Sequence, residues 1–162
     1  MKSLLIIILS LPSIALAQRE FETKNMTYSV GAFSQYSAYK RSEGIEGGVQ
    51  FKNHWLNLGV GYNFGGVKNN GSLSFDYNYL PNSYSNRFNL LFDLNLSMYS
   101  EFGYKFKSSY SRFGVHGSFG FNFNASQHIF IKPIIGYGIE YSFRYSDPDP
   151  SVLFRLSVGY RF

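Results

Sequence analysis

The sequence lacks cysteine, is poor in charged residues and, after its first 17 residues, has no long apolar run. Without cysteine the chain forms no disulfide, so a small domain must find stability elsewhere. Charged residues make up 15% of the chain, against about 25% in ordinary soluble domains. No stretch after residue 17 reads as a transmembrane helix. These absences leave a chain that is neither a disulfide scaffold nor a helical membrane protein.

The sequence is rich in aromatic residues and glycine. Aromatics make up 20% of the chain, there are 16 glycines, and the mean hydropathy is −0.16. This balance is typical of a β-barrel in a membrane, where half of each strand faces lipid and half faces a polar interior. The net charge of +5 is spread along the chain, which favours attraction to anionic lipid headgroups over nucleic-acid binding.

The first residues have the order of regions found in a secretory signal peptide. A lysine at position 2 is followed by the apolar run LLIIILSL, an interrupting proline and the small-residue segment Ala15-Leu16-Ala17. The run is too short to span a bilayer as a stable helix. We therefore expect residues 1–17 to be a cleaved signal peptide and residues 18–162 to form one barrel domain.

Apolar and polar residues alternate through most of the remaining chain. In the final stretch SVLFRLSVGYRF, every second residue from Val152 to Phe162 is apolar or aromatic. Strict alternation indicates strands. The pattern predicts an all-β fold with eight antiparallel strands, connected up and down, at residues 26–37, 44–52, 55–64, 72–80, 87–106, 110–123, 128–143 and 151–162.

Two polar loops and one unusually long segment complete the predicted strand pattern. Residues 38–44 (AYKRSEG) and 144–150 (RYSDPDP) are predicted to be polar loops. The segment 87–106 is long for one strand, and a hidden turn near Ser97–Glu101 is the alternative. Its alternation, broken only by Ser100, favours a single strand that rises above the membrane and ends in a short hairpin, KSS.

The face opposite the apolar stripe distinguishes a membrane barrel from a soluble one. It carries glycine, serine, asparagine and isolated charges of both signs, whereas a water-facing surface usually has more lysine and glutamate. Eight strands leave interior space only for side chains. We therefore predict an interior polar network formed by Asp76, Asp93, Arg112, His116, Lys132, Glu140 and Arg155.

The leader, the eight alternating strands and the terminal VLFRLSVGYRF resemble the small outer-membrane β-barrels of the OmpA, OmpX and opacity-protein type. The resemblance implies a monomer in the outer membrane of a Gram-negative bacterium, in contact with outer-membrane lipids. In that family the barrel assembly machinery recognises the last strand, which ends on an aromatic residue. The matching residues here are Phe154, Leu156, Val158, Tyr160 and Phe162.

The expected function is structural, or a surface-interaction role resembling adhesion, through outer loops and protruding strands. An extracellular protein would be the partner, and a sheet edge near residues 97–113 could bind it by strand addition. A porin-like channel for small solutes is the alternative, although four inward residues would plug it: Arg112, Phe130, Leu153 and Arg155.

A lipid-A-modifying enzyme is a further alternative, because His116, Ser118 and Glu140 share the inner face. No signature supports the geometry that such an enzyme needs, so we predict no catalytic residues. We also predict no cofactor and no metal, because Asp147 and Asp149 offer too few oxygens for calcium.

Overall fold

The computed structural model describes residues 26–37, 40–64, 70–81, 87–101, 112–142 and 145–162. The predicted signal peptide and the KSS hairpin lie outside these residues, as does most of the predicted protruding edge at 97–113. No helix in the described ranges has the length and apolarity needed to cross a bilayer.

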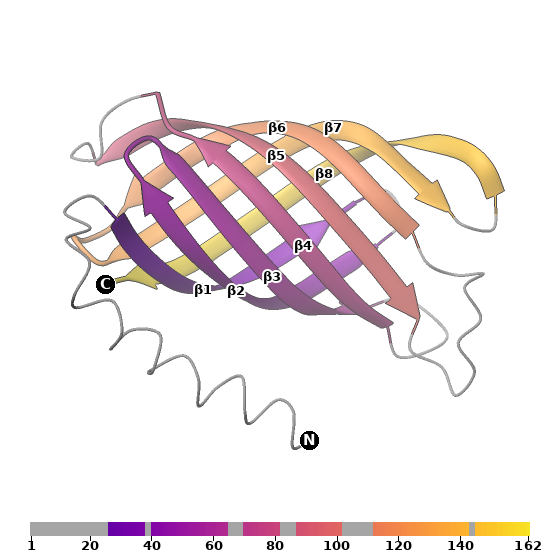
Figure 1. Cartoon of the computed structure of the whole chain (residues 1–162), viewed down its shortest axis with the longest axis horizontal. Helices are drawn as coiled ribbons and strands as arrows, with labels where there is room; N and C mark the ends of the chain where they lie inside the picture. The colour runs from indigo at the N-terminus through magenta and orange to yellow at the C-terminus, as the bar shows by residue number, and fades with distance from the viewer. Residues whose placement is uncertain (1–25, 38–39, 65–69, 82–86, 102–111, 143–144) are drawn as a thin grey trace, which may run out of the picture.

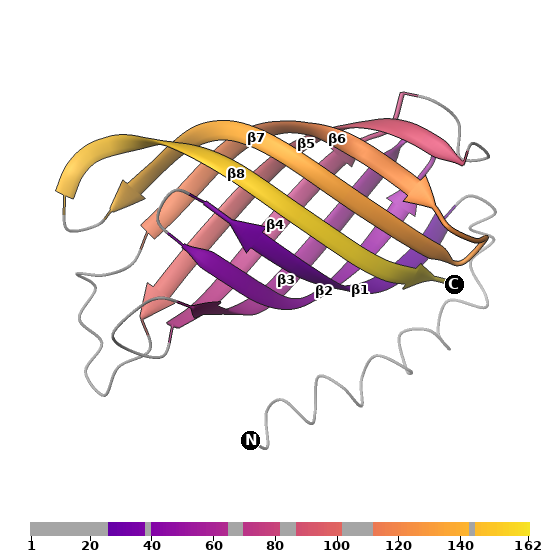
Figure 2. The same cartoon turned by 180° about the vertical axis from the view of Figure 1, so that it is seen from behind.

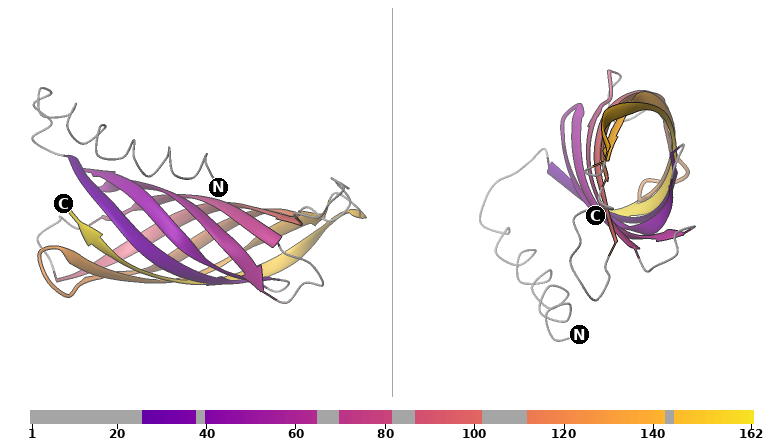
Figure 3. Two further views of the ribbon diagram at one scale, coloured as in Figure 1. Left: turned by 90° about the horizontal axis from the view of Figure 1, so that it is seen from below. Right: turned by 90° about the vertical axis from the view of Figure 1, so that its right-hand side faces the viewer.

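Eight strands form one closed antiparallel barrel in which each strand pairs with its neighbours in sequence and β8 pairs with β1. Figure 1 shows the strands running obliquely around the barrel, and Figure 3 gives the view along it. The predicted fold class is confirmed. The strands are β1 (Met26–Tyr36), β2 (Arg41–Phe51), β3 (His54–Phe64), β4 (Asn70–Tyr79), β5 (Phe88–Glu101), β6 (Arg112–Asn124), β7 (Ile129–Ser142) and β8 (Tyr145–Arg161).

The long segment contains one strand. β5 runs through Ser97–Glu101 without a turn and pairs with β4 as far as Glu101. The hidden-turn alternative is therefore wrong, and the count stays at eight.

Two predicted loops are partly strand. Arg41–Gly44 belong to β2, which pairs with β1 and β3 over that stretch. Tyr145–Pro150 belong to β8 and pair with the end of β7 around a register shift at Tyr141/Ser142. Turn-forming composition misled both predictions. In residues 144–150 the misleading residues are Pro148 and Pro150, which fit a strand because a proline at a sheet edge leaves no partner strand without a donor.

Proline inside the sheet has a visible effect at Pro133. The β6–β7 ladder is continuous to Gly120↔Ile134 and resumes at Phe123↔Ile131, so the pairs beside Pro133 are missing. Proline cannot donate to a ladder, and the carbonyl oxygen of Pro133 points at Gly120 on β6. The backbone of Pro133 therefore faces β6.

Apolar side chains cover the outside of the barrel and polar side chains fill the inside. On β8, Phe154 is 51% exposed and the next residue, Arg155, is 2% exposed. The same alternation holds on β3, whose burial alternates from His54 to Gly59. The exposed face includes Val30, Ile45, Leu58, Phe75, Phe92, Phe119, Ile135, Leu156 and Val158.

Several strands approach so closely that only glycine fits. A Cβ on Gly138 would lie 1.9 Å from the carbonyl oxygen of Val115, a backbone atom that cannot move aside cheaply. At the outward-facing Gly117, on the neighbouring strand, a Cβ would meet nothing within 4 Å.

We predict that Gly138→Ala lowers the free energy of unfolding by about 1–3 kcal/mol, because the β6 backbone must shift. The matched change Gly117→Ala should alter it by less than about 0.5 kcal/mol. Guanidinium unfolding of the barrel in detergent micelles measures both, and equal effects would contradict the close approach.

Candidate functional site

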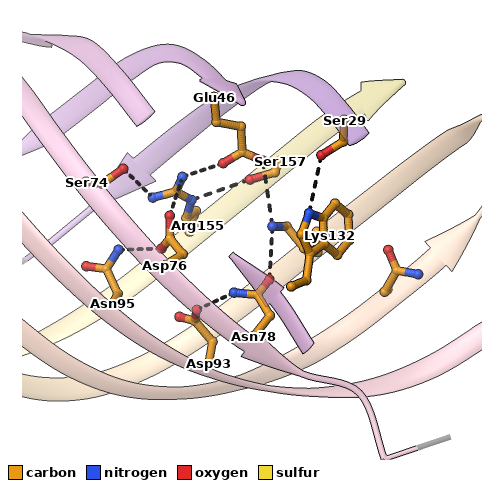
Figure 4. A network of polar contacts seen from close by, with 12 residues as sticks. Ser29, Glu46, Ser74, Asp76, Asn78, Asp93, Asn95, Lys132, Arg155 and Ser157 are labelled. Carbon is orange, nitrogen blue, oxygen red and sulfur yellow. Dashed lines mark hydrogen bonds and ion pairs between the residues drawn. The ribbon is translucent and has the colours of Figure 1, made fainter. Parts of the chain in front are cut away.

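The centre of the barrel holds five charged side chains, Glu46, Asp76, Asp93, Lys132 and Arg155, which we call the ion cluster. They come from β2, β4, β5, β7 and β8, and none is more than 6% exposed. Figure 4 shows them converging on the barrel interior from opposite walls.

Arg155 makes most of the contacts in the ion cluster. Its guanidinium pairs with the carboxylate of Glu46 and lies 2.9 Å from the Asp76 carboxylate. It also donates to Gln35 at 2.8 Å and to Ser74 at 3.1 Å. One side of the guanidinium lies over the Phe33 ring, 4.3 Å from its centre. These contacts satisfy a buried cation from β1, β2 and β4 together.

Lys132 connects Glu46 to Asp93 through the side chain of Asn78. Its ammonium lies 3.7 Å from Glu46 and donates to the side-chain oxygen of Asn78 at 3.0 Å. Asn78 in turn donates to Asp93 at 2.7 Å. The ion cluster therefore contains three carboxylates and two cations, connected through one amide.

An aromatic and aliphatic layer closes the interior at the end near the Lys52–Asn53 turn. It consists of Trp55, Leu80, Leu91, Phe130 and Ile134, all at most 4% exposed. The Trp55 and Phe130 rings meet edge to face with centres 4.7 Å apart. Lys132 lies 4.4 Å above the Trp55 ring, so this layer contacts the ion cluster directly.

Arg161 covers the aromatic layer on its other side. Its guanidinium lies 4.7 Å from the Trp55 ring centre and 5.0 Å from that of Phe130. It donates to the side-chain oxygens of Asn122 and Asn124, each at 2.9 Å.

A second polar group, which we call the outer polar group, lies near the opposite end of the barrel and consists of Arg112, His116, Glu140 and Asp149. Arg112 is 3.4 Å from Asp149 and 4.0 Å from Glu140. Glu140 accepts a hydrogen bond from Ser151 at 2.9 Å and lies 3.9 Å from the His116 ring.

The structure thus divides the seven predicted interior residues into two groups. Asp76, Asp93, Lys132 and Arg155 lie in the ion cluster. The other three, Arg112, His116 and Glu140, lie in the outer polar group.

Glu46 is the ion-cluster residue that sequence reasoning missed. It alternates with the outward Ile45, so its inward position was readable from parity. The glycines of GIEGGV weaken the strand pattern over β2. For that reason the predicted interior network does not include Glu46.

The outer polar group does not form a hydrogen-bonded relay from a nucleophile through a base to an acid. His116 is fully buried, and within the described residues neither of its ring nitrogens makes a hydrogen bond, so it is not engaged with Ser118 as a base. The ranges that the structure covers also contain no group of three or more His, Cys, Asp or Glu side chains that could hold a metal ion.

Four of the five residues of the predicted assembly signal lie on the outward face of β8, and the fifth, Phe162, directly follows its last residue. All five are 44–63% exposed, and β8 pairs with β1 from Arg161 to Phe154. This placement leaves their stripe accessible, and their recognition by assembly machinery stays a prediction.

No protein-family model matches this sequence, and no curated protein matches it. Among solved structures, the N-terminal β-barrel domain of Pseudomonas aeruginosa OprF aligns at a TM-score of 0.64 and 15% identity, over 84% of this chain and 97% of that one. Neisserial surface protein A aligns at 0.47 and 14%, over 84% and 94%. Pseudomonas aeruginosa OprG aligns at 0.47 and 10%, over 85% and 96%.

The fold comparison rests on the first of these matches. Together with the closed eight-stranded topology, it gives this chain the fold of the small outer-membrane β-barrels. The resemblance drawn from the sequence is confirmed at the level of the fold.

The ion cluster provides a stability test. Arg155→Met leaves Asp76 buried without its paired cation and Glu46 with Lys132 alone, and we expect the free energy of unfolding to fall by about 3–5 kcal/mol. Adding Glu46→Gln and Asp76→Asn should recover part of that loss. Denaturant unfolding of the three proteins in one detergent measures both effects.

Arg41→Met is the matched control for Arg155→Met. Arg41 also pairs with a carboxylate, that of Glu43, but the two side chains are 50% and 40% exposed. Solvent screens such a pair, so this change should have a far smaller effect. A loss as large as that of Arg155→Met would mean that burial does not govern the response.

Proposed function

We propose that this chain is an integral protein of the Gram-negative outer membrane, whose sealed barrel anchors its outer end for a structural or surface-interaction role. The observation that carries the proposal is the reversal of polarity: lipid-compatible side chains face outward, and ion pairs face inward. Such an exterior fits acyl chains and not water. The closed backbone ladder supports this, because a membrane tolerates no open sheet edge in its core.

The filled interior favours anchoring over transport. The ion cluster and the aromatic layer lie one above the other along the axis, and Phe130, Leu153 and Arg155 are each at most 2% exposed. Eight strands enclose little more than their own side chains. A solute channel would require Arg155 and Trp55 to leave their partners.

An enzymatic role has weaker support. Lipid-modifying chemistry at a barrel needs a reactive group that lipid can reach. His116 is enclosed on β6 with Glu140 beside it, which suits a structural polar contact.

The remaining surface for partners is the end of the barrel that carries Arg112 and Asp149, and we place that end outside the cell.

The barrel should show heat-modifiable migration. Outer-membrane fractions loaded without boiling should contain a folded form that migrates differently from the boiled form, because the closed ladder resists detergent at room temperature. Electrophoresis of paired samples checks this. Identical migration, together with recovery in the soluble fraction, would remove the membrane proposal.

Planar-bilayer recording separates anchoring from transport. The purified chain should give no large, stable conductance steps, because the interior is occupied at two levels. The variant Trp55→Ala/Phe130→Ala should still show none, since the ion cluster remains. Steady steps from the unaltered chain would favour the porin-like alternative.

A further inference from the structure

β8 continues past the end of the strand that closes the barrel with it. Its ladder with β1 runs from Arg161↔Ser29 to Phe154↔Tyr36, while β8 itself begins at Tyr145. Over residues 145–153, β7 is the only strand of the described chain that pairs with β8. Figure 2 shows β8 extending beyond β1 with β7 alone beside it. Among the described residues, this stretch therefore forms an open sheet edge, which we call the free edge.

The backbone hydrogen bonds at the other end of β8 show which residues face that edge. The N–H and C=O of Phe162 bond to Tyr28 on the β1 side, at 3.0 and 3.1 Å. The N–H of the preceding residue, Arg161, bonds instead to His128, next to β7. Successive residues of an antiparallel strand direct these groups to opposite neighbours. Even-numbered residues of β8 therefore face the β1 side.

Closer to the free edge, a second contact gives the same assignment. The carbonyl oxygen of Val158, another even-numbered residue, approaches Gly31 on β1. The β7–β8 register is regular from Ile129↔Tyr160 to Tyr141↔Pro148. The assignment therefore extends without a break to Pro148.

Two of the three even-numbered residues at the regular part of this edge are proline. Pro148 and Pro150 carry no N–H, and only Val152 offers a donor there. An added strand would meet carbonyl oxygens with almost no donors between them. The interrupted ladder beside Pro133 shows the same effect where a strand is present.

The position of the edge also makes unpaired donors costly. Val152 is 41% exposed and continues the apolar stripe of Phe154 and Leu156. A backbone N–H without a partner is unfavourable at the boundary of a hydrocarbon layer. Proline at the next two edge-facing positions removes their donors, so Val152 is the one residue of the regular edge that keeps an N–H.

We propose that Pro148 and Pro150 close the free edge of β8 to strand addition by a second copy of this chain. Native sheets block exposed edges with proline for this reason. The inference rests on the proposed function only in placing this edge beside the hydrocarbon layer, and it does not depend on what the outer end binds. It implies that a partner at this edge of β8 is recognised through side chains.

The test uses the absence of cysteine from the chain, which makes Val152→Cys a single-cysteine reporter of edge contact. In micelles this variant should form little intermolecular disulfide. Adding Pro148→Thr and Pro150→Thr restores two donors with β-forming residues, and the disulfide-linked dimer should rise at least about tenfold. Non-reducing electrophoresis of the folded protein measures the yield.

The matched control combines Val152→Cys with Pro133→Thr, which restores a donor between two strands that are already paired. This protein should give the low yield of the reporter alone. Equal yields with and without the prolines at 148 and 150 would overturn the proposal, as would a high yield from the control. If the double replacement fails to give the heat-modifiable form, the two single replacements are measured instead, and a rise in neither overturns the proposal.

Discussion

A sheet that crosses a bilayer must satisfy its backbone hydrogen bonds within itself, and this requirement governs the rest of the structure. Closure of β8 on β1 joins the two ends of the sheet and gives side chains along the paired strands one of two directions, outward or inward. In the proposed membrane setting the outward residues can be large and apolar, since they face acyl chains. The inward residues must fill a narrow space and satisfy one another.

The interior meets that demand with two kinds of layer. Near the Lys52–Asn53 turn, Trp55 and Phe130 fill the cross-section with rings, and Arg161 and Lys132 lie against them. Above this layer the ion cluster joins β2, β4, β5, β7 and β8. Buried charges contribute little net stability when compared with apolar packing, but removing one partner is costly. The ion cluster therefore ties distant strands together more than it adds stability.

Period-two alternation made the fold readable from the sequence. The parity of residues such as Phe154 and Arg155 fixed both the strand and the side of the wall, and the structure agrees. Ends of strands were less readable, because local composition competes with pairing. Arg41–Gly44 and Tyr145–Pro150 look like loops, yet neighbouring strands hold them in the sheet. The sequence does not show which inward charges meet. Glu46 and Arg155 are 109 positions apart, and their contact depends on the stagger between strands around the barrel, which no local pattern encodes.

The place of Arg155 on the last strand has a consequence for how the barrel forms. Its partners Gln35, Glu46, Ser74 and Asp76 belong to β1, β2 and β4, so the guanidinium reaches all of them only once β8 has closed on β1. Until the C-terminal strand docks, the carboxylates of Glu46 and Asp76 lack their guanidinium and keep their hydration water. Loss of that hydration water is thereby coupled to closure of the wall.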